Sequence, residues 1–211
     1  MKKTDIILLG GGGHCKACID VIEESGFYKI KGIIDVRDKI GQTILGYKII
    51  DEDRNIEKYL NNSSFLISVG FIKSPDLRVK LFNEIKSTGG ITPVIISPKA
   101  HVSKHATIQQ GTIIMHGAVV NADVFIGENV IVNNLALIEH DVTIGNHTHV
   151  STGARINGGC KIGEKCFIGS GTIINQGISV CSDVIIGSGS LVRKDIDKPG
   201  IYAGSLLKKV K

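Results

Sequence analysis

The sequence predicts a chain in two parts: an α/β domain with a Rossmann-like parallel sheet over residues 1–95, and an all-β solenoid over residues 96–211. In the first half, short apolar segments alternate with amphipathic helical segments, which is the pattern of βαβ units around a parallel sheet. In the second half, isoleucine or valine returns at every sixth residue. A helix repeats every 3.6 residues and cannot sustain this period, whereas short β segments can.

The first half begins with a short buried strand, "TDIILLG", and a loop of four glycines, "GGGG". The helix that follows, "HCKACIDVIEES", is expected to end before Gly26, and its apolar face carries Cys15, Cys18, Ile19 and Ile22. A strand, "KGIIDV", and a turn region with Gly41 and Gly46 come next. A helix near residues 53–60 then precedes a further strand, "SFLISVG".

The last helix of this half, "DLRVKLFNEIKSTGG", is introduced by the residues "SP". Ser74 is expected to be its N-cap and Pro75 its first residue, because serine accepts a free N–H group there and proline has the required φ. The segment "TPVIIS" leads from this helix toward the solenoid.

The glycine loop is the candidate ligand site of the first half, since the N-terminus of a helix offers free N–H groups to an anion or a nucleotide. As an NAD fingerprint the loop fails: Gly10 and Gly12 fit G-x-G-x-x-G, but the last position is Cys15. A tight turn from strand to helix, with no ligand, accounts for the same glycines. The spacing alone leaves both interpretations open.

The period of six runs through the second half without interruption. Stepping by six from Val102 to Val192 gives sixteen positions, and every one is isoleucine or valine. Side chains two residues before each aliphatic position are usually small, which suits a second inward position at a corner. Glycine directly follows the aliphatic residue at five places, and we expect a positive φ there. These glycines are Gly127, Gly145, Gly163, Gly169 and Gly187. Three hexapeptides form one triangular coil, so the repeat predicts about five coils that rise roughly 4.8 Å each and share one core.

Composition excludes several classes of protein. The net charge of +5 comes with no basic stripe interleaved with aromatic residues, so nucleic acid is not an expected partner, although phosphate-bearing small ligands suit this charge. Five cysteines in both halves do not form a disulfide framework, and the single C-x-x-C of Cys15 and Cys18 is a weak zinc signal. Apolar runs are too short to span a membrane and no signal peptide is evident, so a cytoplasmic protein is expected.

The order of the motifs adds a family resemblance. "GGGGHCKACIDVIEESG", "GIIDVR", "SVGF" and "IEHDVTIGNHTHVSTGARINGGCKIG" together resemble closely the sugar acyltransferases typified by the bacillosamine-pathway N-acetyltransferase and the sialic acid O-acetyltransferases, within the hexapeptide-repeat acyltransferases. The resemblance covers essentially the whole chain. It implies a left-handed β-helix, a homotrimer with active sites between subunits, acetyl-CoA as donor and no metal.

In the solenoid, the resemblance assigns the general base to His140 and the residue that increases its basicity to Asp141. A histidine suits this step, because a hydroxyl or amine must lose a proton as it attacks the thioester of acetyl-CoA. His149 is expected to contact acetyl-CoA, as are the main-chain groups near Gly158, Ser170 and Ser188, one of which can stabilise the oxyanion. His140 and His149 are nine residues apart, half a coil, so we expect them on different sides of the solenoid.

In the first half, the resemblance assigns a nucleotide-linked sugar to five residues: phosphates to Gly12, Gly13 and His14, the base or ribose to Asp35, and a further contact to Gly70. Two departures from the family pattern stand out. Phe71 follows this last glycine where a polar residue is common, and "GSLLKK" at residues 204–209 replaces the usual G-x-P-A-K near the wall of the CoA channel.

The leading hypothesis is therefore transfer of an acetyl group to the 4-amino group of a nucleotide-linked deoxyamino sugar, with UDP as the expected nucleotide, for a bacterial surface glycan or glycoprotein. O-acetylation of sialic acid or a related sugar would use the same residues. A zinc lyase like the γ-type carbonic anhydrases would need three histidines from neighbouring chains, and a non-catalytic binding or scaffold protein would not need His140. Surface decoration is the interpretation for the remaining solenoid histidines, His101, His105, His116 and His147.

Overall fold

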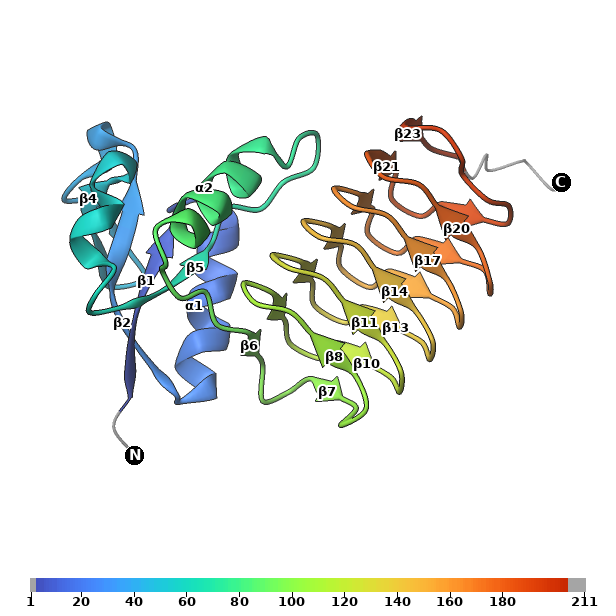
Figure 1. Cartoon of the computed structure of the whole chain (residues 1–211), viewed down its shortest axis with the longest axis horizontal. Coiled ribbons are helices and arrows are strands. Elements are labelled where there is room, and N and C mark those ends of the chain that lie inside the picture. The colour runs from blue at the N-terminus through green and yellow to red at the C-terminus, as the bar shows by residue number, and fades with distance from the viewer. Residues whose placement is uncertain (1–2, 205–211) are drawn as a thin grey trace, which may run out of the picture.

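The computed structural model describes residues 3–204 and shows the two-part architecture that the sequence predicts. An α/β domain and a stack of triangular coils lie end to end, with the first coils next to the domain and the last coils farthest from it (Figure 1). Of the segment 204–209 that departs from the family pattern, residues 205–209 lie outside the described residues. No helix within residues 3–204 has the length and the apolar character for crossing a membrane.

The α/β domain is built on a five-stranded sheet with the order β3-β4-β2-β1-β5. Four of its strands are parallel and β3 is antiparallel to β4. One face of the sheet is covered by α1, and the other by α2 and a 3-10 helix, η2. The elements are β1 (Thr4–Leu9), α1 (Gly13–Ser25), β2 (Tyr28–Asp35), η1 (Arg37–Lys39), β3 (Thr43–Ile44), β4 (Tyr47–Glu52), η2 (Asp53–Tyr59), β5 (Ser64–Ile67) and α2 (Asp76–Ser87).

Most elements of this domain are where the sequence predicts them, with three differences. Strand β4 was not expected; it pairs with β3 through a tight turn in which Leu45 and Gly46 both have positive φ, 47° and 88°, as a two-residue hairpin requires. The helix expected near residues 53–60 is the 3-10 helix η2. Helix α2 begins at Asp76, after Pro75, although the Ser74 hydroxyl does accept the Asp76 N–H at 3.1 Å.

The second half is a left-handed parallel β-helix whose two- and three-residue strands form three flat faces (Figure 1). Most strands pair in parallel with the strand eighteen residues later, as Leu137 does with Arg155. In the last coil β21 pairs with β23 at an offset of sixteen, as Val184 does with Gly200. The β15 face consists of β6 (Ile95–Ile96), β9 (Ile113–Ile114), β12 (Ile131–Val132), β15 (His149–Val150), β18 (Phe167–Ile168), β21 (Val184–Ile186) and β23 (Gly200–Tyr202). The β13 face consists of β7 (His101–Val102), β10 (Val119–Val120), β13 (Leu137–Ile138), β16 (Arg155–Ile156), β19 (Ile173–Ile174) and β22 (Leu191–Val192). The β14 face consists of β8 (Thr107–Ile108), β11 (Phe125–Ile126), β14 (Thr143–Ile144), β17 (Lys161–Ile162) and β20 (Ser179–Val180).

The six-residue series forms the core of this β-helix, as predicted. Every member from Ile114 to Val192 is buried, and Val102 and Ile108, in the first coil, are partly exposed. The small side chains two residues earlier fill the corners, with Thr112, Ala118, Ala154 and Cys166 fully buried. Each buried β-branched side chain contributes roughly 1.5–3 kcal/mol of apolar burial, and no coil could bury its series without its neighbours.

The glycines that directly follow the aliphatic residues do not have positive φ, so that expectation was wrong. The positive φ values lie two residues further on, at Gly153 and Gly177 and also at non-glycine residues such as Asp141 and His147. The real constraint on the predicted glycines is distance between coils. A Cβ atom at Gly145 would lie 2.6 Å from the backbone N of Glu164. The corresponding backbone contacts are 2.5 Å at Gly163 and Gly169 and 2.8 Å at Gly127.

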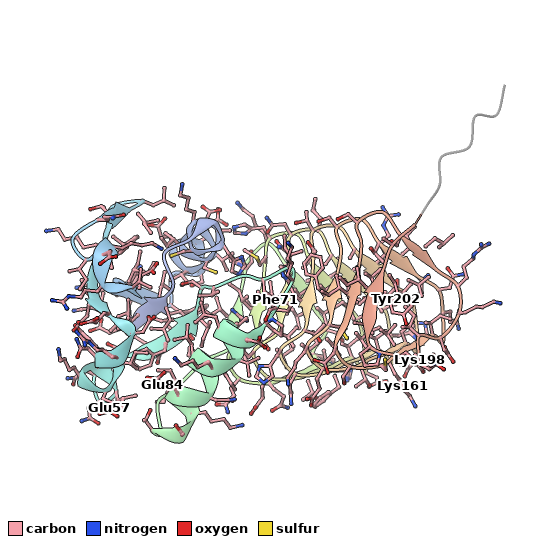
Figure 2. All side chains as sticks on the ribbon, turned by 90° about the horizontal axis from the view of Figure 1, so that it is seen from above. Glu57, Phe71, Glu84, Lys161, Lys198 and Tyr202 are labelled. Atoms are coloured by element: carbon pink, nitrogen blue, oxygen red, sulfur yellow. The ribbon has the colours of Figure 1, made fainter. Side chains whose placement is uncertain are left out.

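The α/β domain rests on the β15 face. Ile95, Ile113 and Ile131 point outward from the coils, yet they are buried in one cluster with Cys15, Cys18 and the other apolar residues of α1 and the sheet. The C-x-x-C motif is therefore part of this core. Phe71 lies at the boundary between the domain and the coils, whereas Glu57 and Tyr202 lie toward opposite ends of the molecule (Figure 2). The expected boundary between residues 95 and 96 falls inside β6, which belongs to the β15 face of the β-helix. The β-helix therefore begins slightly before the expected boundary.

Substituting alanine at two glycines separates the two constraints on the turns. We expect Gly145→Ala to lower the free energy of unfolding by about 3 kcal/mol, because its Cβ would push adjacent coils apart. Gly153→Ala, at φ 64° with no atom within 4 Å of its Cβ, should cost only about 1–2 kcal/mol of backbone strain. Denaturant unfolding of both purified variants measures the difference, and equal losses would contradict this account of the glycines.

Candidate active site

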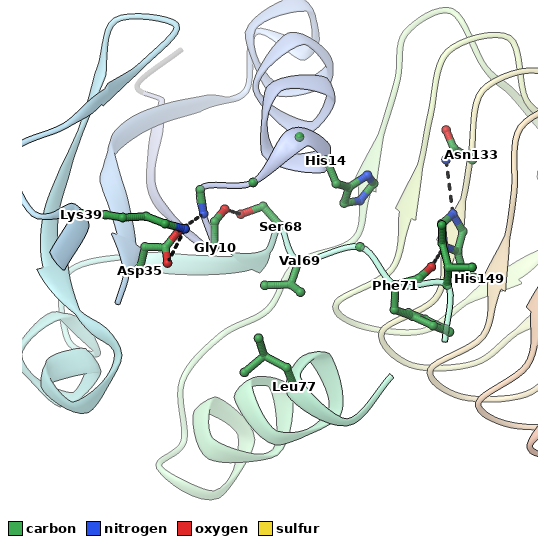
Figure 3. Close-up of a pocket in the computed structure, with 15 residues that line it drawn as sticks. Gly10, His14, Asp35, Lys39, Ser68, Val69, Phe71, Leu77, Asn133 and His149 are labelled. Carbon is green, nitrogen blue, oxygen red and sulfur yellow. Dashed lines mark hydrogen bonds and ion pairs between the residues drawn. The ribbon is translucent and has the colours of Figure 1, made fainter. Parts of the chain in front are cut away.

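A cavity of about 520 Å³ lies where the α/β domain meets the coils. It opens at the carboxyl ends of β1 and β5, where the strand order of the sheet reverses and ligands of α/β sheets usually bind. Figure 3 shows the glycine loop and Lys39 on one side and the coil residues on the other. The lining residues are Gly10, Gly11, Gly12, Gly13, His14, Asp35, Lys39, Ser68, Val69, Gly70, Phe71, Ile72, Leu77, Asn133 and His149. All five residues predicted to bind the nucleotide-linked sugar are therefore brought together here.

The glycine loop presents backbone N–H groups to this cavity. Helix α1 begins at Gly13 with no side-chain cap and no acidic residue in its first turn, so its N-terminal N–H groups and partial positive charge are available to an anion. Cβ atoms built on Gly12 and Gly13 would meet nothing within 4 Å, whereas one on Gly11 would lie 2.9 Å from a carboxylate oxygen of Asp35. The loop is thus packed against β2 on one side and open on the other.

Asp35 holds the glycine loop in place. Its carboxylate accepts hydrogen bonds from the N–H groups of Gly11 at 2.6 Å and Val36 at 2.7 Å. Lys39 donates to both oxygens, at 3.0 and 3.1 Å. Burial alone would raise the pKa of Asp35, but these hydrogen bonds and the charge of Lys39 outweigh it and hold the pKa below its ordinary value. The sequence pointed to Asp35 as a ligand of base or ribose and missed Lys39.

His14 lies over the end of β5. Its Cβ is 3.2 Å from the Cβ position that a side chain at Gly70 would take, so glycine is needed there for close packing. The Nε2 atom of His14 is buried and has no hydrogen-bond partner in the described part of the chain. Burial, assisted by the positive charge of Arg78, lowers the pKa of His14 to about 3. His14 is therefore a neutral side chain with an unused polar atom beside the cavity.

His149 joins the coils to the loop after β5. Its Nδ1–H donates to the Phe71 carbonyl at 2.9 Å, and its Nε2 accepts from the side-chain amide of Asn133 at 3.3 Å. The rings of Phe71 and Phe167 contact it edge to face. Burial lowers the pKa of His149 to about 4, so the imidazole is neutral. The sequence pointed to a contact with acetyl-CoA and missed both partners of this histidine.

Arg78 is a further residue that the sequence analysis missed. It is 1% exposed, and its guanidinium donates to the carbonyls of Ile67 and Val69 at the end of β5 and of Asn129 in the coils. Burial lowers its pKa to about 10. Arg78 fixes the end of β5 against the β-helix. The signal was present in the sequence, because Arg78 occupies the apolar helical series with Leu81, Phe82 and Ile85.

His140 lies at the corner between the β13 and β14 faces, away from this cavity. Its Nδ1 is 2.7 Å from Oδ2 of Asp141, a pairing of adjacent residues in which Asp141 has the left-handed φ of 60°. The neighbouring coils carry Ala122 and Gly158 at the same corner, and a Cβ at Gly158 would lie 2.7 Å from Cε1 of His140. Glycine there leaves room for the imidazole.

The hydrogen bond with Asp141, and the negative charges of Asp141 and Glu139, raise the pKa of His140 above its ordinary value. The side chains of His140 and Asp141 are 59% and 64% exposed in the single chain. With Nδ1 held by the carboxylate, Nε2 is the nitrogen that remains to exchange a proton with a ligand. His140 and His149 lie on different sides of the β-helix, as their spacing predicts.

Three of the four residues predicted to bind acetyl-CoA are on two corners of the coils, and the fourth, His149, is in β15. Gly158 is at the corner of His140. Ser170 and Ser188 are at the corner between the β15 and β13 faces, where the Ser170 hydroxyl bonds that of Ser151 at 2.9 Å and Ser188 is exposed. The β13 face spans the distance between these two corners.

Two histidines interpreted as surface decoration are structural contacts instead. His147 is 9% exposed, with Nδ1 3.0 Å from the Asn129 side-chain nitrogen and its ring against Phe82. His116 bridges the first coils to α1: Nδ1 is 2.7 Å from the Ser97 hydroxyl and Nε2 is 2.9 Å from Asp20. The six-residue period could not reveal either role, because both partners come from the other domain or another coil. Within residues 3–204, no three His, Cys, Asp or Glu side chains are grouped as metal ligands.

Known proteins match both halves of the chain. Residues 5–85 match the family model of the PglD N-terminal domain, and residues 123–158 and 159–194 match that of the bacterial transferase hexapeptide, six repeats. No curated protein matches. Among solved structures, PerB from Caulobacter crescentus, in complex with CoA and GDP-perosamine, is 27% identical with a TM-score of 0.87, over 95% of this chain and 94% of that chain.

A second solved structure is the acetyltransferase domain of PglB from Neisseria gonorrhoeae, in complex with acetyl coenzyme A. It is 28% identical with a TM-score of 0.88, over 96% of this chain and 97% of that chain. The fold and the matched repeats define an acyltransferase of the hexapeptide-repeat class. Within that class, the chain combines a first half that matches the PglD N-terminal domain with the hexapeptide repeats, and it is similar over nearly its whole length to PerB and to the PglB acetyltransferase domain.

The neutral state of His149 predicts a loss of stability in acid. With a pKa of about 4 in the folded chain and about 6.5 in the unfolded chain, the unfolded chain binds the proton first as pH falls. This one group should therefore lower the free energy of unfolding by about 2 kcal/mol between pH 6.5 and pH 5. His149→Gln should remove that share of the pH dependence in denaturant titrations at both pH values. His105→Gln, at an exposed position, is the control; equal pH slopes for wild type and His149→Gln would contradict the assignment.

Proposed function

We propose that the protein is an acetyl-CoA-dependent N-acetyltransferase acting on the 4-amino group of a nucleotide-linked deoxyamino sugar. The observation that carries this proposal is the cavity itself, in which a glycine loop at the uncapped start of α1 faces Asn133 and His149 of an acyltransferase β-helix. PerB, a similar protein, binds CoA and GDP-perosamine, and the similar PglB domain binds acetyl coenzyme A. Together they support both co-substrates for this chain.

The cavity suits the nucleotide-linked sugar. Its diphosphate would accept hydrogen bonds from the backbone N–H groups of Gly12, Gly13 and His14 at the start of α1. Asp35 and Gly70 line the parts of the cavity next to this loop, where the nucleoside would lie. UDP is the nucleotide that the family resemblance favours, and GDP is the first alternative because PerB binds GDP-perosamine.

The chemistry would follow from the pairing of His140 with Asp141. The sugar amine attacks the carbonyl carbon of the thioester, and its proton passes to Nε2 of His140 while Asp141 holds Nδ1–H. The oxyanion that forms needs a hydrogen-bond donor, and a backbone N–H near Gly158 is the proposed one. The C–S bond then breaks, and the thiolate of CoA takes the proton from the imidazolium.

The proposal requires more than one copy of the chain, because His140 does not line the cavity of its own chain. The first coils of the β15 face are covered by the α/β domain, while the outward residues of the β13 face are largely apolar: Val119, Leu137, Ile173 and Leu191. A homotrimer joined along this face would place His140 at the edge of a neighbouring cavity. Acetyl-CoA would lie between two subunits along the edges of this interface, against Ser170, Ser188 and Gly158, with its acetyl end toward the cavity that His149 lines.

The test of the function is a screen of UDP-, dTDP-, GDP- and CMP-linked sugars with acetyl-CoA, following release of free thiol. Turnover of a 4-amino sugar nucleotide, with an amide in the product, is the expected result. Turnover only of sugars that offer a hydroxyl would assign O-acetylation instead. Stoichiometric zinc in the active purified protein would favour a metal-dependent lyase, and no turnover at all would favour a binding protein. A cytoplasmic location is part of the proposal, because acetyl-CoA is its donor.

His140→Ala should lower kcat by roughly 10²–10⁴-fold, the usual contribution of a general base, with little change in the KM for acetyl-CoA. The acceptor found in the screen is used for these kinetics. His105→Ala, at an exposed position outside the corner, is the matched control. Turnover near that of the wild type would show that His140 is not the base.

Asp141→Asn keeps a residue that tolerates the left-handed φ of 60° and removes the charge. Asp141 raises the pKa of His140, and the base must be neutral to act. The acid limb of the pH profile of kcat/KM should therefore move to lower pH in this variant, with a lower maximum. An unchanged acid limb would mean that Asp141 does not act through His140.

A site shared between copies predicts recovery of activity on mixing two inactive variants. His140→Ala lacks the base, and Asp35→Ala lacks the carboxylate that holds the glycine loop. In trimers that contain both variants, about a third of the sites would receive both intact parts from adjacent subunits. Co-expression with two affinity tags and an assay of the doubly purified protein measures this. If the site lay within one chain, the mixture would stay inactive.

A further inference from the structure

Lys39 is a charged residue of the cavity to which no family motif assigns a role. Its side chain extends from η1 across the cavity wall to Asp35, and it is 42% exposed, whereas the Asp35 side chain is 9% exposed (Figure 3). Among the described residues that line the cavity, Lys39 alone is a lysine or arginine. The lining carboxylate and this ammonium cancel, and His14 and His149 are neutral.

The hydrogen bonds of Asp35 leave it no capacity for a ligand. A carboxylate has about four lone-pair sites. The N–H groups of Gly11 and Val36 take one on each oxygen, and Lys39 takes one more on each. Ribose hydroxyls could reach Asp35 only if Lys39 moved away, because the two N–H groups belong to the backbone.

Lys39 is also the donor that can move. It lies at the end of a three-residue 3-10 helix, on a flexible four-carbon chain, and it is half-exposed. The nearest anion site is the uncapped N-terminus of α1, whose loop residue Gly11 bonds the same carboxylate as Lys39 does. An ammonium released from Asp35 would therefore remain next to any phosphate held by this loop.

We propose that Lys39 exchanges its counter-ion when the nucleotide-linked sugar binds: it leaves Asp35 for the diphosphate, and Asp35 then accepts the ribose hydroxyls. This inference rests on the proposed function and adds to it the residue that neutralises the diphosphate. Asp35 would lose two hydrogen bonds from Lys39 and gain two from the ribose hydroxyls, so the buried carboxylate keeps its hydrogen bonds in both states. It also makes binding of the nucleoside and binding of the phosphates interdependent.

The experiment measures binding of UDP, GDP, dTDP and CDP by calorimetry, and of the matching nucleosides by competition, to the full chain. For the diphosphate that binds the wild type best, Lys39→Met should lower affinity at least about tenfold, as expected for a lost hydrogen bond to a charged group. Affinity for the nucleoside should stay unchanged or rise, because Asp35 is freed. Lys39→Arg should retain most of the diphosphate affinity. Lys31→Met is the control, since Lys31 makes a similarly exposed pair with Asp5 outside the cavity.

Three results would overturn the exchange. Unchanged diphosphate affinity in Lys39→Met would mean that Lys39 does not bind phosphate. Equal losses for nucleoside and diphosphate would mean that Lys39 only positions Asp35 and the glycine loop. Failure of all four diphosphates to bind the wild type would remove the nucleotide-linked substrate, and with it both the exchange and the proposed function. The first two results leave the proposed function intact, so the two failures are distinguishable.

Discussion

The close stacking of coils that match residue for residue at a distance of eighteen is the constraint on which the rest of the structure depends. Backbones of adjacent coils approach so closely that a Cβ at Gly145 or Gly163 would overlap the next coil. Side chains at a given corner therefore stand in columns, one per coil. The column of Ala122, His140 and Gly158 gives the imidazole a small neighbour on each side, and its orientation follows from that column.

The junction between the domains uses a different kind of chemistry. Its apolar part joins α1 to Ile113 and Ile131. Around the cavity the contacts are polar and include a buried cation, Arg78, which donates to backbone carbonyls and pairs with no carboxylate within residues 3–204. Burial is the main cause of the lowered pKa of His14, His147 and His149, and the positive charge of Arg78 lowers all three further. The side of the cavity formed by the coils therefore offers uncharged hydrogen-bonding groups. The charged pair, Asp35 and Lys39, lies in the opposite wall, formed by β2 and η1.

Much of the fold could be predicted from the sequence, because period and composition are local properties. The sixteen-position series specified the β-helix core, and the alternation of segments specified the parallel sheet with helices on both faces. Strand β4 escaped prediction because its only strong signal was a hairpin turn at Leu45 and Gly46. The glycines in the coils were assigned to the wrong cause, since a requirement for space between coils and a requirement for positive φ produce the same residue.

The sequence predicted which residues line the candidate site, but it did not predict the hydrogen bonds that hold them in place. The motifs brought Gly12, Gly13, His14, Asp35 and Gly70 to one cavity, but the partners of His149, which are Phe71 and Asn133, lie 78 and 16 residues away in sequence. The contact with Phe71 depends on how the α/β domain docks on the β-helix, and the contact with Asn133 depends on how adjacent coils stack. No local pattern encodes either of them. Lys39 was overlooked for a related reason, because a lysine four residues after an aspartate on a short turn is unremarkable until the carboxylate is known to be buried.

The stacked columns also constrain how this protein can change its length over evolution. Deletion or duplication of one whole coil after Ile174 keeps every column in register and leaves the α/β domain on the same strands. The same change between Ile131 and His140 would displace the corner that carries His140 by one step of about 4.8 Å relative to the cavity. The number of coils can thus vary at the C-terminal end of the stack. Between the α/β domain and the corner of His140 it cannot, because the distance from that corner to the cavity would change.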